Sequence, residues 1–181
     1  MSSSSADRRV ALPEGTLPVG LALLIAGLAT FAFFKIGEWA LGGEDQFKPI
    51  VSMWFATFAI APGLYLPLEQ ELGRALAHRR ALGQGGLPVV RRVVTTGAVI
   101  SVVTLVIVLA ASPLITSEYF DGDWWMMAAL VTSFVAYAPA HIARGICAGT
   151  GRFRAYGQVI GSDGIVRIVV CVAMAGVGIT A

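Results

Sequence analysis

Long stretches without charged residues restrict the possible folds of this 181-residue chain more than any other feature of its sequence. Four of these stretches contain no Asp, Glu, Lys or Arg: 17–34, 49–68, 93–117 and 124–143. A fifth, 155–181, is interrupted by Asp163 and Arg167 alone. A helix needs about 20 apolar residues to cross the roughly 30 Å of hydrocarbon in a bilayer. The pattern therefore predicts an all-α, polytopic transmembrane helix bundle with about five spans.

The composition excludes several other classes of protein. Charged residues make up 13% of the chain and hydrophobic residues 56%, whereas a soluble domain carries about 25% charged residues. This balance excludes an ordinary soluble enzyme and a nucleic-acid-binding module, and the formal net charge of +2 is too small to indicate a polyanionic partner. The sequence has no G-x-S-x-G, H-E-x-x-H or phosphate-binding loop. We therefore predict no enzymatic activity, no cofactor and no metal site.

The charge-free stretches divide the chain into two parts. Residues 1–16, which include the run Ser2–Ser5, are predicted to be a disordered cytoplasmic lead. Residues 17–181 are predicted to form the transmembrane bundle, with its spans at 17–36, 47–68, 91–114, 124–144 and 156–179. No A-x-A cleavage site ends the first span, so we expect it to remain uncleaved.

Basic residues are concentrated in alternate segments, which predicts the orientation of the bundle. Ten of the 13 Lys and Arg residues lie in three segments: 1–16, 69–92 and 144–154. Two lysines and six acidic residues lie in the segments between them: 35–48 and 118–123. The positive-inside rule therefore places the N-terminus and two basic segments, 69–90 and 144–155, in the cytoplasm, and the C-terminus outside.

The first basic segment carries apolar residues on roughly one helical stripe: Leu68, Leu72, Ala75, Leu76 and Leu82. Two interpretations are open. The segment is either an amphipathic helix at the cytoplasmic interface, with its cations facing lipid headgroups, or a solvated continuation of the second span.

Asp163 and Arg167 lie inside the fifth span, four residues apart, and so share one helical face. A helix that begins near Ala155 places them about 12 Å and 18 Å along its axis, on either side of the bilayer midplane. Charges at this depth are costly unless they are paired or face water. We expect them to line a polar cavity for an ionic substrate or coupling ion. The alternatives are a structural ion pair, or a span that begins nearer Ile168.

Two segments resemble the N-terminal part of bacterial polysaccharide-biosynthesis flippases, which belong to the multidrug/oligosaccharidyl-lipid/polysaccharide exporter superfamily and are related to MATE antiporters. The first is APGLYLPLEQELGRALAHRRALGQG at 61–85, with a PLEQE motif expected to form a turn after the second helix. The second is AHIARGICAGTGRFRAYGQVIGSDGIVR at 140–167, with an ARG-x-x-AG-x-GRF motif expected to form a turn between the fourth and fifth helices. The motif positions are Pro67, Leu68, Glu69, Gln70, Glu71, Ala143, Arg144, Gly145, Ala148, Gly149, Gly151, Arg152 and Phe153.

This resemblance implies a transporter that moves a lipid-linked saccharide across the bacterial cytoplasmic membrane for cell-surface polysaccharide synthesis. In such a transporter Arg167 would contact the phosphate, and Asp163 would hold Arg167 in the unloaded state. Arg144 and Arg152 would meet the headgroup at the cytoplasmic mouth. The expected partners are membrane lipids and the lipid-linked saccharide.

Members of this family have two lobes of transmembrane helices. The roughly five spans predicted here are enough for one lobe at most. We expect the chain to be a fragment of a longer protein, or to work with a partner chain that supplies the rest; a remnant without transport activity is the third possibility. Two other functions stay open. One is a small multidrug or ion transporter that acts as a homo-oligomer, and the other is a non-transporting membrane scaffold.

Overall fold

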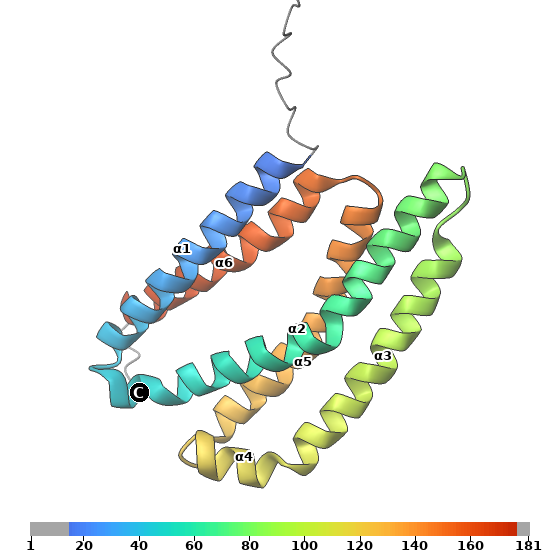
Figure 1. The fold of residues 1–181 in the computed structure, drawn as a ribbon. Helices are drawn as coiled ribbons and strands as arrows, with labels where there is room; N and C mark the ends of the chain where they lie inside the picture. Colours follow the sequence, from blue (N-terminus) through green and yellow to red (C-terminus); the bar gives the residue numbers. More distant parts are fainter. Residues whose placement is uncertain (1–14, 177–181) are drawn as a thin grey trace, which may run out of the picture.

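The computed structural model describes residues 15–176, which form six helices (Figure 1). These are α1 (Thr16–Ala40), α2 (Glu44–Ala81), α3 (Leu87–Ala110), α4 (Ser112–Tyr119), α5 (Trp124–Gly149) and α6 (Phe153–Gly176). All except α4 are long and apolar enough to cross a membrane, so the predicted polytopic helical bundle is confirmed. Most of the predicted lead and the end of the fifth predicted span lie outside the described residues.

The five long helices pack as two groups. In Figure 1, α1 lies along α6 and α2 lies along α5, with α3 beside α2 and α5. The short helix α4 connects α3 to α5. The α1–α2 turn joins the α1/α6 pair to the α2/α5 pair at one end of the bundle, and the α5–α6 turn joins them at the opposite end (Figure 1).

Small residues hold α1 and α6 close together. Ala22 and Ala29 of α1 are buried. A Cβ atom added to Gly157 of α6 would lie 2.9 Å from the carbonyl oxygen of Pro18, and one added to Gly164 would lie 3.0 Å from the Cβ of Ala29. Lipid tails are as apolar as leucine, so membrane helices associate through close packing of this kind.

Small residues also allow α2 and α5 to pack closely. Gly145 and Gly149 lie four residues apart on α5. A Cβ atom at Gly145 would lie 2.8 Å from the carbonyl oxygen of Glu69, and one at Gly149 would lie 2.7 Å from that of Gly73. The backbones of α2 and α5 therefore approach each other at positions where a larger side chain would separate them.

Helix α2 runs without a break through the segment that was predicted to follow the second span. This segment is therefore a continuation of the second helix, as one of the two interpretations predicted. Leu72 and Leu76 are buried in a cluster with Val93 of α3, to which Ile146 of α5 also contributes. Part of the apolar stripe therefore packs against neighbouring helices, whereas Leu82 at its end is 57% exposed. Figure 1 shows α2 changing direction near its middle, where Pro62 and Pro67 each remove a helical hydrogen bond.

The third span begins and ends earlier than the predicted 91–114, because α3 runs from Leu87 to Ala110 and the short helix α4 follows it. Pro113 lies in the first turn of α4 and has no N–H to donate to the carbonyl of Leu109. The hydroxyl of Ser112 donates to that carbonyl instead, at 2.7 Å. The fourth span extends past its predicted end to Gly149, and the fifth begins earlier than predicted, at Phe153.

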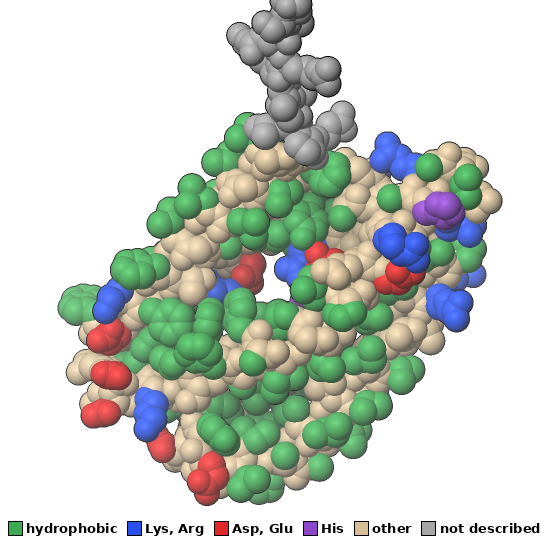
Figure 2. Space-filling model, viewed as in Figure 1, with side chains coloured by type: hydrophobic (Ala, Val, Ile, Leu, Met, Phe, Trp, Pro, Cys, Tyr) green, Lys and Arg blue, Asp and Glu red, His purple; other side chains and the backbone are tan. Residues whose placement is uncertain are grey.

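Opposite charges gather at the two ends of the bundle. The basic end contains the start of α1, the α2–α3 turn and the α5–α6 turn; the acidic end contains the α1–α2 and α4–α5 turns (Figure 1). In Figure 2, Lys and Arg side chains predominate where α2 meets α3, and Asp and Glu side chains where α1 meets α2. The predicted orientation places the basic end in the cytoplasm.

Candidate functional site

A cavity of about 510 Å³ lies between the α1/α6 pair and the α2/α5 pair. Figure 2 shows it as an opening in this face of the molecule, with charged side chains at its edge. Its walls come from α1, α2, α5 and α6 and are mostly apolar. Its polar lining residues are Thr30, Tyr137, His141, Arg144, Asp163 and Arg167.

Asp163 and Arg167 line this cavity from α6. Nη2 of Arg167 lies 2.6 Å from Oδ2 of Asp163, the i,i+4 ion pair that the spacing suggested. Because α6 begins at Phe153, the two residues lie about 15 Å and 21 Å along a helix about 36 Å long. They bracket the middle of the span, and a span beginning near Ile168 is excluded.

Arg167 also contacts two other helices, α1 and α2. Its Nη1 donates to the hydroxyl of Thr30 on α1 at 3.4 Å, and its guanidinium carbon lies 5.4 Å from the ring centroid of Phe58 on α2. The Arg167 side chain is 18% exposed, whereas that of Asp163 is 69% exposed. The cation therefore lies deep in the cavity, while its carboxylate partner remains open to the surroundings.

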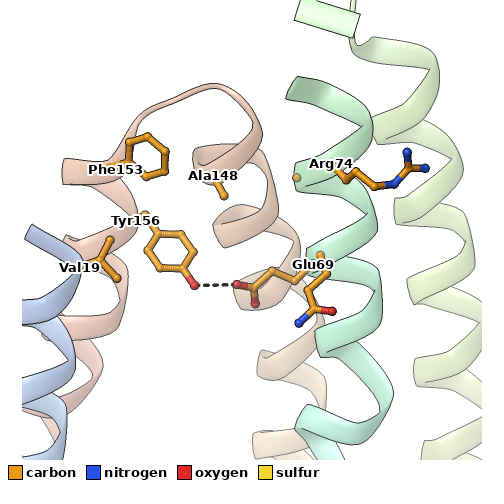
Figure 3. A pocket seen from close by; sticks show the side chains of 8 residues that line it. Val19, Glu69, Arg74, Ala148, Phe153 and Tyr156 are labelled. Carbon is orange, nitrogen blue, oxygen red and sulfur yellow. Dashed lines mark hydrogen bonds between the residues drawn. The ribbon is translucent and has the colours of Figure 1, made fainter. Parts of the chain in front are cut away.

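A second polar cluster lies toward the basic end and is centred on Glu69 of α2. This carboxylate is 5% exposed. Its Oε2 accepts hydrogen bonds from Nδ1 of His141 at 2.7 Å and from Nε of Arg144 at 3.0 Å. Its Oε1 accepts from the hydroxyl of Tyr156 at 2.9 Å, as Figure 3 shows. We call Glu69, His141, Arg144 and Tyr156 the Glu69 cluster.

The Glu69 cluster brings Arg144 close to both ring nitrogens of His141. Nδ1–H of His141 donates to Oε2 of Glu69 at 2.7 Å. Nη2 of Arg144 lies 2.7 Å from Nδ1 and 3.0 Å from Nε2 of that ring, and 2.9 Å from Oε2 of Glu69. The buried carboxylate is therefore balanced by one guanidinium, as a charge at this position requires.

The Glu69 cluster separates the cavity from a second depression at the basic end. His141 and Arg144 line the cavity. Glu69 and Tyr156 line the depression, with Val19 at the start of α1. Figure 3 shows Arg74, which also lines it, pointing away from Glu69. The cluster thus closes the basic side of the cavity.

Aromatic side chains fill the space between α1 and α2 toward the acidic end. The Phe34 ring on α1 lies 5.0 Å from that of Trp54 on α2, and Trp54 stacks on Phe58 at 4.3 Å. Phe47 is buried and packs against Gly37, where a Cβ atom would lie 2.5 Å from its ring. The cavity is therefore bounded by rings on one side and by hydrogen-bonded polar groups on the other.

The structure separates the two arginines that the sequence assigned to a common cytoplasmic mouth. Arg144 lies within α5 and faces the cavity. Arg152 lies in the α5–α6 turn, is exposed, and lines a different depression together with Arg154. The predicted turn between the fourth and fifth spans is present at residues 150–152, although its motif is helical up to Gly149. The PLEQE motif is helical within α2, so the turn predicted there is wrong.

Sequence reasoning missed Glu69 and His141 as site residues. Glu69 follows a charge-free stretch directly and was grouped with the basic segment, while His141 was counted as a neutral residue of a span. A usable signal exists, because Tyr65, Glu69, Leu72 and Leu76 follow a 4-3-4 spacing that places them on one helical face.

Among residues 15–176, no three His, Cys, Asp or Glu residues lie close enough to hold a metal ion. The polar groups of the Glu69 cluster bond to one another, and Asp163 bonds to Arg167. The chain matches no protein-family model, and no curated protein or solved structure is significantly similar to it.

Proposed function

We propose that the chain is part of a transporter that moves a lipid-linked saccharide across the bacterial cytoplasmic membrane for cell-surface polysaccharide synthesis. The observation that carries this proposal is the cavity between the two helix pairs, into which Arg144 and Arg167 project at different depths. The family resemblance of the sequence points in the same direction. A partner chain or a further half of the protein would complete the translocation path.

The lining of the cavity suits a phosphate-linked ligand. Arginine binds phosphate through several N–H groups in a fixed plane, and such charge-assisted bonds strengthen where water is scarce. Arg167 and Arg144 supply two such groups, and the rings of Phe58 and Tyr137 supply apolar surface for a sugar. The volume, about 510 Å³, is that of a pocket for a headgroup, so the polyprenyl chain would stay in lipid.

Charge balance explains how an anion could enter. The two arginines are paired with carboxylates, Arg167 with Asp163 and Arg144 with Glu69. The Asp163 side chain is 69% exposed and that of Arg167 is 18% exposed, so Asp163 is the more accessible partner of the pair. A phosphate group would take the place of Asp163 at Arg167, and Asp163 would then have to face water in the cavity, because an unpaired charge at this depth is costly in lipid.

The test is binding to the full chain in nanodiscs of phosphatidylcholine. We expect a pyrophosphate-linked polyprenyl saccharide to bind tightly and the corresponding uncharged polyprenol to bind poorly. Arg167→Ala should weaken binding of the charged lipid about 10- to 100-fold, because it removes hydrogen bonds to a charged group. Arg91→Ala is the matched control, since Arg91 is exposed on α3 and outside the cavity.

Equal affinity for the two lipids, or an unchanged affinity in Arg167→Ala at normal protein levels, would refute the proposal. A preference for a lipophilic cation such as tetraphenylphosphonium would favour a small multidrug transporter instead. If the charged lipid binds, reconstitution in vesicles with and without co-expressed partners then measures translocation.

A further inference from the structure

Arg144 has two roles that compete with each other. Its guanidinium lines the cavity, where an anionic ligand would meet it. The same guanidinium is the positive partner of Glu69, whose side chain is 7% exposed against 22% for Arg144. An anion that draws Arg144 toward the cavity therefore leaves a buried carboxylate without its counterion, which is strongly unfavourable.

His141 is placed to compensate for that loss. Its Nδ1–H already donates to Glu69 at 2.7 Å, and Nη2 of Arg144 lies 2.7 Å from Nδ1 and 3.0 Å from Nε2. When Arg144 moves away, its positive charge no longer opposes a proton on Nε2. A proton taken from water forms a new N–H bond there, and the imidazolium becomes the positive partner of Glu69.

We propose that His141 binds a proton when an anionic phosphate or pyrophosphate group occupies the cavity, so that ligand binding and proton uptake are coupled. This coupling rests on the proposed function and adds a proton site to it. The charges balance: one proton enters, Arg144 passes from Glu69 to the ligand, and the carboxylate stays paired. A proton gradient across the membrane would then influence binding.

The groups around His141 support this assignment. From α2 it faces Glu69 and the ring of Tyr65; from α5 it faces Arg144 and the ring of Tyr137. From α6, Tyr156 shares the Glu69 carboxylate, while Asp163 and Arg167 lie in the same cavity and pair with each other. The α1 residues in the cavity lining are Leu23, Ala26, Gly27 and Thr30, and none of these four titrates. Glu69 and Arg144 therefore dominate the charge that His141 experiences.

The coupling is measured with the full chain in phosphatidylcholine nanodiscs and geranyl pyrophosphate as the probe. Titration calorimetry in two buffers of different ionisation enthalpy counts the protons that are taken up on binding. We expect about one proton per ligand on the alkaline side of the histidine range, which spans roughly pH 5 to 8. Affinity should then fall about tenfold per pH unit as the pH rises. Binding without proton uptake overturns the coupling.

Histidine variants identify the group that takes the proton. His141→Gln keeps a donor toward Glu69 but cannot become charged, so proton uptake and the pH dependence of affinity should both disappear. His78→Gln is the matched control, because His78 is the other histidine in the sequence and is exposed near the basic end. It should behave as the unaltered chain. Proton uptake that persists in His141→Gln overturns the assignment to His141.

A second variant gives the same answer if His141→Gln does not fold. Glu69→Gln removes the buried negative charge, so Arg144 can leave without the need for a new cation. Proton uptake should vanish while geranyl pyrophosphate still binds, and uptake that persists in this variant refutes the coupling.

The two proposals fail in different ways. If geranyl pyrophosphate does not bind the unaltered chain, the proposed function fails; if it binds without proton uptake, only the coupling fails. Nanodiscs with added phosphatidylglycerol separate two sources of the anion. Competition by that lipid, with the same proton uptake, would assign the coupled site to lipid headgroups, and lack of competition would assign it to a pyrophosphate-linked ligand.

Discussion

The hydroxyl of Tyr156 donates a 2.9 Å hydrogen bond to Oε1 of Glu69, and this bond joins α6 to α2 across the basic side of the cavity. The other carboxylate oxygen of Glu69 is held by His141 and Arg144 of α5. Glu69 therefore connects the α2/α5 pair to the α1/α6 pair. Each pair is closely packed within itself, so loss of this contact should affect the space between the pairs more than the pairs themselves.

Tyr156→Phe removes the hydroxyl and keeps the ring. We expect the unfolding free energy to fall by about 1 kcal/mol, the net value of one hydrogen bond. The distance between spin labels at Leu28 on α1 and Val103 on α3, both exposed, should become longer or more broadly distributed. Tyr119→Phe is the control, because Tyr119 is 61% exposed on α4. Unchanged stability and label distances in Tyr156→Phe would show that the bond does not hold the pairs together.

Removing the two partners of the buried ion pair should have unequal effects. Arg144→Gln removes the guanidinium partner of the buried Glu69, and we expect a loss of up to about 3–5 kcal/mol of stability, which becomes smaller at low pH because a proton on His141 can replace the lost charge. Glu69→Gln should cost less, because Arg144 reaches the cavity. The double variant, Arg144→Gln with Glu69→Gln, should be more stable than the sum of the two single losses predicts. Unfolding of all four proteins in detergent measures this difference as a double-mutant cycle. Arg74→Gln serves as the control, since its pair with Glu71 is exposed on the same helix and its loss should be too small to resolve. Equal and additive losses would contradict the pairing.

The glycines between α2 and α5 should not tolerate a methyl group. Gly145→Ala places Cβ 2.8 Å from the backbone of Glu69, and Gly149→Ala places it 2.6 Å from the Cβ of Leu76. Each should lower the unfolding free energy by about 1–3 kcal/mol, the usual cost of overpacking. Gly20→Ala on α1 has no neighbour within 4 Å of the added atom and should be neutral. Destabilisation by Gly20→Ala equal to that of the other two would refute the close approach.

The predicted orientation can be tested by labelling cysteines. In a Cys147→Ser/Cys171→Ser background, a cysteine at Gln84 in the α2–α3 turn should react with a membrane-impermeant maleimide only after the cells are permeabilised. A cysteine at Glu118 near the acidic end should react in intact cells. Both positions are exposed. The reverse pattern would show that the basic end faces outward.

The number of spans could be predicted from sequence because hydrocarbon thickness sets a minimum length for each apolar helix. The helix ends could not, since a helix continues into water wherever it has packing partners there. Leu72 and Leu76 continue α2 because α3 and α5 cover them. The local sequence of α2 does not show that α3 and α5 pack against it; this follows from the fold of the whole bundle.

The polar site was predicted in part. Asp163 and Arg167 were identifiable because they interrupt a long apolar stretch. Glu69 lies at the edge of such a stretch, where a solvated charge is the common case. Its burial depends on Gly145, which lets α5 approach, and on the turn that returns Tyr156 to the same level. These are properties of three helices together, and the sequence around Glu69 shows only the spacing that places it on one helical face with Tyr65, Leu72 and Leu76.

The pairing of α1 with α6 also sets an order of assembly during synthesis. Thr30 and Arg167, which meet across this pair, are separated by 137 residues. At about 5–20 residues per second, translation delivers α6 on the order of ten seconds after α1 has entered the bilayer. Until then the small-residue face that contains Ala22 and Ala29 must contact lipid or an insertion factor. The cavity wall is therefore the last part of the bundle to form, and a ribosome that stalls before α6 would leave α1 without its partner in the membrane.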